Sequence, residues 1–489
     1  MRKAQLASLA LVGVLAGLLA TVGGASHGGG GFDTSKPAYL VPTAAGVQVD
    51  PIISTGDIVG DYQMSGIPDG LGGYRRTDVR GRVDNGHARG RMVRVLMNHE
   101  LGRSFPNNPP GVDTRITRLD IDRHTRRVLA AEYLFTGHEL FERFCSATLM
   151  LIDGRPLYFT GEEAVPMAGQ PPGPAHDGSS IVMDAETGFY REAPHFGHFQ
   201  HENVVPLKLS QWVFLSSEDD FRPGPSYLYA YIANDFQRGV RGTTGSLYVW
   251  RANDLAKNQN SAVVKNESVP GHFVPIPQSE NMNSTQLKAA ATARNGFRFD
   301  RLEDVAAHPD IRGRTYVADT GKPPTTARGR VFQFDVNPAN PTLATLKMIL
   351  NGDPPDGDDI YNPDNMDASE RVLMIQEDRE SAFRDPPFSG GYGRVMEYRF
   401  SNQALRSVAR VNTPAPLRPG TWESSGIIDA GHLLGRDWWL LDVQAHSTTA
   451  PQPGPSLVPN SSSGEDGQFL ALHVPGSQGG GGGHNDDDD

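Results

Sequence analysis

The stretch Gly329-Arg330-Val331-Phe332-Gln333-Phe334 has a counterpart further along the chain in Gly393-Arg394-Val395-Met396-Glu397-Tyr398. Each stretch follows an apolar run, residues 315–318 and 372–375, across a loop that contains glycine. Two apolar runs joined in this way predict two antiparallel strands, because glycine allows the chain to reverse sharply. The repeat of this unit is typical of a β-propeller, in which small antiparallel sheets surround a central channel.

Further short runs rich in β-branched and aromatic residues occupy the rest of the chain. Gly, Pro, Asn or Asp bound nearly every run, as expected for strands. The runs are residues 93–97, 158–160, 212–215, 227–232, 246–250, 438–441 and 468–472, and the last two form a looser third copy of the repeat. With a period of about 50–60 residues, the pattern predicts an all-β fold, a six-bladed β-propeller with long loops between its strands. A β-sandwich with long loops is the alternative.

The composition supports one large β domain in place of two or three smaller ones. Of the 489 residues, 38% are hydrophobic, which is enough for a core. The 55 glycines and 37 prolines indicate many turns and argue against a helical bundle. The formal net charge of −12 argues against nucleic acid as a partner. We assign residues 40–475 to a single propeller domain.

The two ends of the chain predict export and a flexible tail. Arg2 and Lys3 precede an uncharged apolar run, residues 6–22, and small residues follow it. This pattern predicts a signal peptide over residues 1–25 and a secreted protein, extracellular or periplasmic, with no stable membrane insertion after cleavage. A membrane anchor that stays attached is the alternative. Residues 26–39 are a Gly-rich flexible segment, and residues 476–489 form a disordered Gly/Asp tail.

Acidic and amide residues recur where the predicted strands begin or end. A single such cluster is usually a turn, because Asp and Asn terminate strands through hydrogen bonds to the backbone. Recurrence at the same place in successive repeats points to one channel mouth, where cations would neutralise the carboxylates. Hard oxygen donors select calcium or magnesium, so we predict a multi-metal carboxylate site. The clusters are residues 98–100, 162–163, 198–203, 218–220, 301–304, 364–367, 377–378 and 422–426.

Cys145, the single cysteine, allows two interpretations. A lone cysteine is usually a small buried hydrophobic residue. In an exported protein a free thiol is open to oxidation, so deep burial or metal ligation must protect it. A thiolate is softer than a carboxylate, and as a ligand it would bring in a transition metal such as iron.

The motifs, taken in order, resemble those of the PhoX-type secreted alkaline phosphatases. The resemblance spans roughly residues 60 to 450, and its parts follow one another in the order seen in that family. The motifs that carry it are Ile67-Pro68-Asp69-Gly70-Leu71-Gly72, Met97-Asn98-His99-Glu100, Arg143-Phe144-Cys145-Ser146, Gly161-Glu162-Glu163, residues 198–203, Arg301-Leu302-Glu303, Pro363-Asp364-Asn365 and Glu423-Ser424-Ser425-Gly426.

This resemblance implies a β-propeller that hydrolyses phosphate monoesters at a cluster of iron and calcium ions. It makes Cys145 an iron ligand and Glu303 a metal ligand. Arg301 and Glu303 are then the predicted catalytic residues, and Arg301 and Asn98 are predicted to bind the phosphorylated small-molecule substrate. The remaining metal positions would be filled by Glu100, Glu162, Glu163, Glu202, Asp364, Asn365 and Glu423.

Two other functions fit the same sequence. One is a calcium-stabilised propeller that binds partners and catalyses nothing, and the other is a propeller lactonase or esterase. The chain has no Gly-x-Ser-x-Gly motif, which argues against a serine hydrolase. It also has no Gly-x-x-x-x-Gly-Lys-Ser/Thr motif, which argues against a P-loop nucleotide site.

Overall fold

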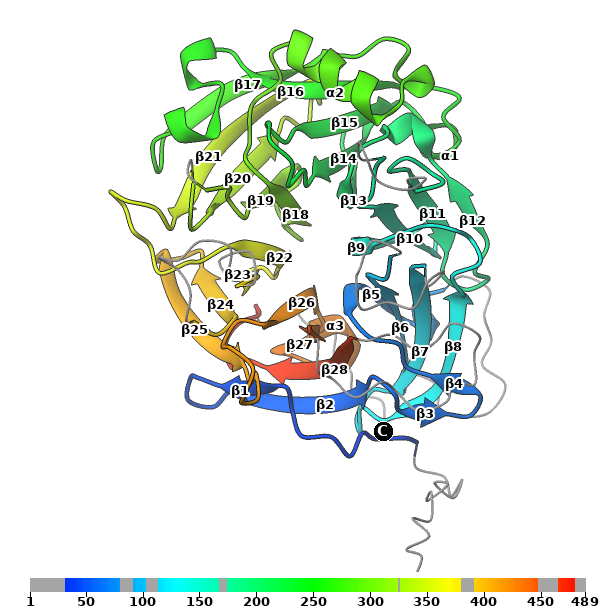
Figure 1. The fold of residues 1–489 in the computed structure, drawn as a ribbon. Helices are drawn as coiled ribbons and strands as arrows, with labels where there is room; N and C mark the ends of the chain where they lie inside the picture. Colours follow the sequence, from blue (N-terminus) through cyan, green and yellow to red (C-terminus); the bar gives the residue numbers. More distant parts are fainter. Residues whose placement is uncertain are drawn as a thin grey trace, which may run out of the picture.

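The structure, a computed structural model, describes residues 31–79, 91–102, 113–166, 174–323, 326–379, 391–446 and 465–479. Most of the regular elements in this part of the chain are strands, and their sheets surround a central axis (Figure 1). The prediction of an all-β, propeller-like architecture is therefore confirmed. The predicted signal peptide and the end of the acidic tail lie outside the described residues.

Four sheets are separate blades of antiparallel strands. Two of them are built from consecutive strands, β5 to β8 and β9 to β12. The other two each add one strand from the beginning of the chain. The four blades are β5 (Pro68–Arg75), β6 (Met92–His99), β7 (Arg115–Asp122) and β8 (Val128–Phe135); β9 (Phe144–Ile152), β10 (Arg155–Glu162), β11 (Ser180–Asp184) and β12 (Tyr190–Glu192); β22 (Pro363–Ala368), β23 (Val372–Glu377), β24 (Arg394–Arg399) and β25 (Ala404–Val411) with β1 (Leu40–Pro42); and β26 (Trp422–Asp429), β27 (Trp438–Ala445) and β28 (Asp466–His473) with β2 (Gln48–Ser54).

The fifth large sheet corrects the predicted number of blades. It has nine strands in the order β13, β14, β15, β16, β17, β21, β20, β19, β18, so the described structure has four blades and one long sheet in place of six separate blades. The cause is β17, whose two edges pair with β16 and with β21 and thereby join two meanders. The strands are β13 (His201–Lys208), β14 (Trp212–Glu218), β15 (Leu228–Ala233), β16 (Ser246–Ala252), β17 (Ser268–Pro275), β18 (Leu302–Ala307), β19 (Arg314–Asp319), β20 (Arg330–Val336) and β21 (Leu343–Asn351).

The beginning of the chain closes the ring of sheets. Leu40 of β1 pairs with Val411 of β25, and Gln48 of β2 pairs with His473 of β28. Two blades formed by the end of the chain thus take their outermost strands from its first described residues (Figure 1). This pairing covers the outer edges of β25 and β28, and β1 and β2 become the edge strands of the two blades.

Apolar side chains fill the spaces between neighbouring sheets. Phe159 of β10 and Phe214 of β14 belong to one buried cluster although they come from different sheets. Truncating such a buried aromatic side chain typically costs about 3–5 kcal/mol. Helix α2 (Ser284–Ala293) adds Leu287 to this cluster, and α1 (Phe236–Val240) and α3 (Gly431–Leu434) are short. No helix within the described ranges is long and apolar enough to cross a membrane.

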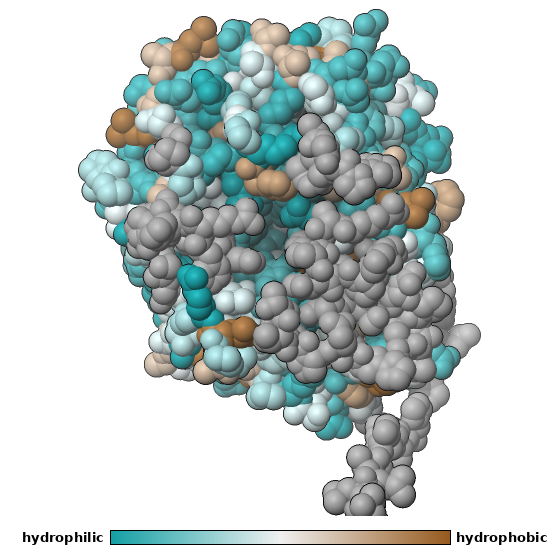
Figure 2. All heavy atoms as spheres, viewed as in Figure 1, coloured by the Kyte–Doolittle hydropathy of each residue, from teal (hydrophilic) through white to brown (hydrophobic). Residues whose placement is uncertain are grey.

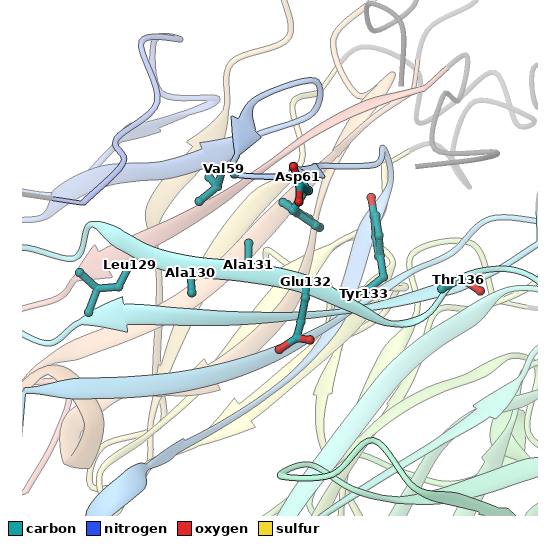
Figure 3. A pocket seen from close by; sticks show the side chains of 10 residues that line it. Val59, Asp61, Leu129, Ala130, Ala131, Glu132, Tyr133 and Thr136 are labelled. Carbon is teal, nitrogen blue, oxygen red and sulfur yellow. The ribbon is translucent and has the colours of Figure 1, made fainter. Parts of the chain in front are cut away.

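A small hairpin, β3 (Ile58–Val59) and β4 (Tyr62–Gln63), lies against the outermost strand of the first blade. It forms one wall of a pocket whose other wall is β8 (Figure 3). Val59 and Leu129 line the pocket together with Asp61 and Glu132. The pocket lies at the outer strand of the blade, away from the inner strands.

Candidate metal and active site

Six inner strands surround the axis and contact one another in the order β5, β9, β13, β18, β22, β26 and back to β5. All six carry a β-bulge in their first half. The pairing register shifts between Pro68 and Leu71, Phe144 and Ala147, His201 and Val204, Leu302 and Val305, Pro363 and Met366, and Ser425 and Ile427. A bulge inserts a residue and re-aims the side chains around it. Asp69, Glu202, Glu303 and Asp364 all lie within these bulges.

Side chains that could ligate metal ions form four overlapping groups around the axis. Within each group the ligand atoms all lie within 4.8 Å of one another. Successive groups share a residue, so together they form one continuous chain of possible ligands. The groups are Asp69, Glu100 and Cys145; Cys145, Glu163 and Glu202; Glu202, Glu303 and Asp364; and Asp364, Asp378 and Glu423.

The structure brings together seven of the predicted ligands: Glu100, Cys145, Glu163, Glu202, Glu303, Asp364 and Glu423. It adds Asp69 and Asp378, which sequence reasoning did not select. Both lie in motifs that the sequence pointed to, Ile67-to-Gly72 and Glu377-Asp378. Around the axis the described surface is hollowed and hydrophilic (Figure 2).

Burial disfavours the ionised form of these carboxyl groups when no cation is nearby. Glu202 and Glu303 are 2% and 3% exposed. Desolvation raises the pKa of both side chains well above the usual range, and neighbouring carboxylates raise it further. A set of buried oxygen donors with one sulfur donor fits several divalent or trivalent cations, which would hold the carboxylates in their charged form.

Cys145 lies at the junction of two of these groups. Its thiol donates a hydrogen bond to Oε2 of Glu163 at 3.1 Å, and the side chain is 4% exposed. Nη2 of Arg143 contacts the same Glu163 oxygen at 2.5 Å and Oε1 of Glu100 at 3.0 Å. Burial and then the nearby carboxylates raise the pKa of the thiol. The cysteine is thus buried, as one interpretation of the sequence predicted, and is also among carboxylates, as the other required.

Arg301 lies beside the group formed by Glu202, Glu303 and Asp364. Its Nε and Nη2 donate to the two carboxylate oxygens of Asp219 at 2.9 and 2.6 Å. Nη2 also contacts Oε1 of Glu303 at 2.8 Å. Asp219 is a residue that sequence reasoning did not single out within the cluster Glu218-Asp219-Asp220. Its neighbours are held by Lys288 of α2, which forms ion pairs with Glu218 and with Asp220.

Besides Arg301, three predicted site residues lie outside the four groups. Asn98 donates to the carbonyl of Cys145 at 2.6 Å and accepts from the Tyr158 hydroxyl, so it supports the strand that carries the cysteine. Glu162 accepts hydrogen bonds from the backbone of Glu142 and Gly178 at 2.8 and 2.9 Å. Asn365 of β22 donates to Asp69 of β5 at 3.2 Å and to Ser146 of β9 at 2.6 Å, and thereby links three blades.

The last blade supports Asp69 from the other side. Nε2 of Gln444 donates to Asp69 at 3.1 Å and to Glu100 at 3.0 Å. Gly426, at φ +39°, occupies the bulge of β26, where a β-carbon would lie 2.6 Å from the carbonyl oxygen of Asp69 and 2.8 Å from Asp442. Only glycine allows both this backbone conformation and this close approach.

A known structure shares the fold of this chain at low sequence identity. No protein-family model and no curated protein matches the chain. Among solved structures, PhoX of Pseudomonas fluorescens in complex with vanadate, a transition state analogue, superposes with a TM-score of 0.64 at 13% identity, over 92% of this chain and 100% of that one. The chain has a PhoX-like fold. The α-L-arabinanase of Penicillium chrysogenum complexed with arabinobiose matches with a TM-score of 0.41 at 9% identity, over 87% of this chain and 97% of that one.

The ligand groups of the structure agree with the sequence motifs on one point. Both place the acidic clusters of successive repeats around a common axis. At 13% identity the likeness concerns the fold, and the activity has to be argued from the side chains of this chain.

Proposed function

We propose that the protein is a metal-dependent phosphatase that hydrolyses phosphate monoesters at the inner ends of its blades. The observation that carries the proposal is the position of Arg301, a guanidinium held 2.8 Å from Glu303 at the edge of a continuous set of metal-ligating side chains. A phosphate monoester is a dianion, and carboxylates alone would repel it. Cations together with an arginine make the same site attractive to it.

The residues themselves suggest where each kind of cation would bind. The groups made only of carboxylates, Glu202 with Glu303 and Asp364, and Asp364 with Asp378 and Glu423, suit calcium. The groups that share Cys145 suit a softer metal, and we propose iron there. Bound cations would neutralise the phosphate and lower the pKa of a coordinated water.

The chain's own contribution is then to bind and orient the ester. Arg301 offers planar N–H donors to the non-bridging phosphate oxygens, and Asp219 fixes the plane of that guanidinium through two hydrogen bonds. We further propose that the protein acts outside the cytoplasm on small phosphorylated molecules, in keeping with the predicted signal peptide. Nothing in this arrangement requires a nucleophilic side chain.

The test is phosphate release from p-nitrophenyl phosphate at alkaline pH by protein loaded with calcium and iron. We expect Arg301→Ala to lower kcat/KM by roughly 100-fold or more, since hydrogen bonds between charged groups are worth about 1.5–3 kcal/mol each. Arg301→Lys keeps the charge without the planar pair of donors and should recover only part of the loss. The exposed Arg191 on β12 provides the control variant Arg191→Gln. Absence of phosphate release from the loaded protein would contradict the proposal.

A second candidate is a cation-stabilised propeller that binds a partner without catalysis. It is favoured by the fact that the ligand groups join residues of neighbouring inner strands, so bound cations would tie the blades together. Removing them with EDTA would then lower the thermal unfolding temperature strongly, because buried carboxylates would be left to repel one another. Strong EDTA sensitivity without phosphate release, and full tolerance of Arg301→Ala, would favour this candidate.

A further inference from the structure

Arg379 is a buried guanidinium with no hydrogen-bond acceptor among the described residues. The residue is 9% exposed, and its Nε and Nη1 are buried without a hydrogen-bond partner in that part of the chain. Its guanidinium makes a cation–π contact with Tyr361, and the centroid of that ring lies 4.1 Å from the Arg379 Cζ. A buried cation with unpartnered N–H groups is costly unless something supplies acceptors.

Three guanidinium groups, those of Arg328, Arg379 and Arg394, gather around the Tyr361 ring. Arg328 and Arg394 also lie over the Tyr361 ring, with their Cζ atoms 4.7 and 5.5 Å from its centroid. Arg394 is balanced by two carboxylates, Glu377 at 2.7 Å and Asp359 at 2.8 Å. No carboxylate among the described residues lies within ion-pair distance of Arg379. Glu377 and Asp359 also attract the Arg379 guanidinium, but neither accepts a hydrogen bond from it, so its buried N–H groups have no acceptor among the described residues.

This arginine lies next to the ligand groups at the same end of the blades. Asp378, the preceding residue, belongs to the group with Asp364 and Glu423. Tyr361 lies just before β22, the strand that carries Asp364, and the backbone of Asp378 donates to Asn362 at 2.9 Å. The pair Arg379–Tyr361 thus borders the candidate active site between the entry of β22 and the exit of β23.

Gly391 lets the guanidinium occupy this position. A β-carbon at residue 391 would overlap Nη2 of Arg379, so any other residue there would force the side chain to move. The Arg379 guanidinium therefore lies against the backbone of Gly391 and against the ring of Tyr361. Such a preorganised guanidinium loses little conformational entropy when it binds an anion.

We propose that Arg379 binds a second anionic group of the substrate, a carboxylate or a further phosphate. This inference rests on the proposed phosphatase function and names a substrate class for it: phosphate monoesters that carry another anionic group a few bonds away. In this proposal one anion is held beside Arg301 and the other beside Arg379. Esters with a single anionic group leave the Arg379 donors without acceptors.

Matched substrates test the proposal directly. Phosphoserine differs from phosphoethanolamine by one carboxylate, and propanediol bisphosphate differs from propanediol monophosphate by one phosphate. We expect kcat/KM to be roughly 10- to 100-fold higher for the member of each pair with the extra anion, mainly through a lower KM. The two pairs also show whether the second group is a carboxylate or a phosphate.

Variants distinguish anion binding by Arg379 from a purely structural role of this arginine. Arg379→Gln should abolish the preference within each pair, while Arg191→Gln should keep it. Gly391→Ala retains the charge but displaces the guanidinium, and should reduce the preference without removing an arginine. Thermal unfolding of each variant shows whether it has folded. An unchanged preference in both Arg379→Gln and Gly391→Ala would overturn the proposal.

Failure of the anion site and failure of the phosphatase function give different results. Equal kcat/KM within both pairs, with clear phosphate release, would refute the anion site alone. If no phosphate is released, calorimetric titration with phosphoserine and phosphoethanolamine in the presence of calcium still tests the site. Tighter binding of phosphoserine that is lost in Arg379→Gln would support it, and equal binding would refute it.

Discussion

Asp219 and Arg301 form a two-point ion pair in which both carboxylate oxygens accept from one edge of the guanidinium. The two residues come from different strand ends, Asp219 after β14 and Arg301 directly before β18. The pair therefore fixes the orientation of the arginine relative to the bulge that holds Glu303. If Arg301 binds phosphate, Asp219 acts as its positioning residue.

Replacing Asp219 by asparagine should disturb the site without removing the arginine. Asparagine keeps one acceptor oxygen and lacks the negative charge, so the guanidinium loses its fixed plane. We expect kcat/KM for p-nitrophenyl phosphate to fall by about 10-fold, less than for Arg301→Ala. Steady-state kinetics measures the effect. The neighbouring variant Asp220→Asn breaks ion pairs with Arg222 and Lys288 instead and should stay within about twofold of the wild type.

Cys145 allows a spectroscopic test of the proposed iron. A thiolate bound to ferric iron gives a charge-transfer absorption in the visible range, because the metal deprotonates the thiol. We expect this band when the protein is loaded with ferric iron. Cys145→Ser should lack it, and calcium alone should give none in either protein. A band that persists in Cys145→Ser would show that Cys145 is not the ligand.

Gly426→Ala should destabilise the protein far more than a comparable change elsewhere. Both Gly426 and Gly60 have positive φ, +39° and +61°, but a β-carbon at Gly60 meets nothing within 4 Å. We expect Gly60→Ala to lower the free energy of unfolding by about 1 kcal/mol and Gly426→Ala by about 3 kcal/mol or more. Denaturant unfolding measures both. Similar losses would mean that the contact between residue 426 and Asp69 is not tight.

Asp429 should give the protein a measurable pH dependence away from the ligand groups. Burial raises the pKa of this carboxyl from 3.8 to about 6. The native state therefore binds the proton more tightly than the unfolded state, and stability falls as the pH rises from about 4 to about 6. Above that range the cost of ionising the buried group remains in full.

Asparagine at position 429 removes this cost and keeps the local hydrogen bonds. Oδ1 of Asp429 accepts from both Gly431 and Gln478, at 2.8 and 2.6 Å, and an amide oxygen can do the same. We expect Asp429→Asn to be more stable than the wild type by about 1–2 kcal/mol near pH 8 and to show no gain below about pH 4. The exposed Asp61→Asn should show no such difference. A gain that does not depend on pH would contradict the explanation.

Local strand pairs could be predicted from the sequence, whereas the joining of two meanders could not. The runs 315–318 and 330–334 became β19 and β20, because their apolar residues lie close in the chain and a glycine-containing loop links them. In contrast, β17 contains Pro270 and Gly271, which argue against a strand paired on both edges. Its pairing with β21 depends on contacts between distant segments that no local pattern encodes.

The candidate site was predictable as a set of motifs but less so as individual side chains. In Glu162-Glu163 the second residue joins the ligand groups and the first accepts backbone hydrogen bonds. In Glu377-Asp378 the second also joins them, while Glu377 pairs with Arg394. Neighbouring residues in a strand point in opposite directions, and a bulge changes which of the two faces the axis. The position of a bulge follows from packing between blades, which the sequence alone does not give.

The ring of sheets closes only when two late strands, β25 and β28, pair with β1 and β2 from the beginning of the chain. Residues 48–54 have no partner strand until residues 466–473 have been synthesised. A chain interrupted just before residue 466 leaves β2 without its partner strand, and it leaves the blade that carries Glu423 and Gln444 without its third strand. Glu423, the last of the ligand residues in the chain, thus lies in a blade that only β28 and β2 complete, so that cation retention would report whether residues 466–473 are in place.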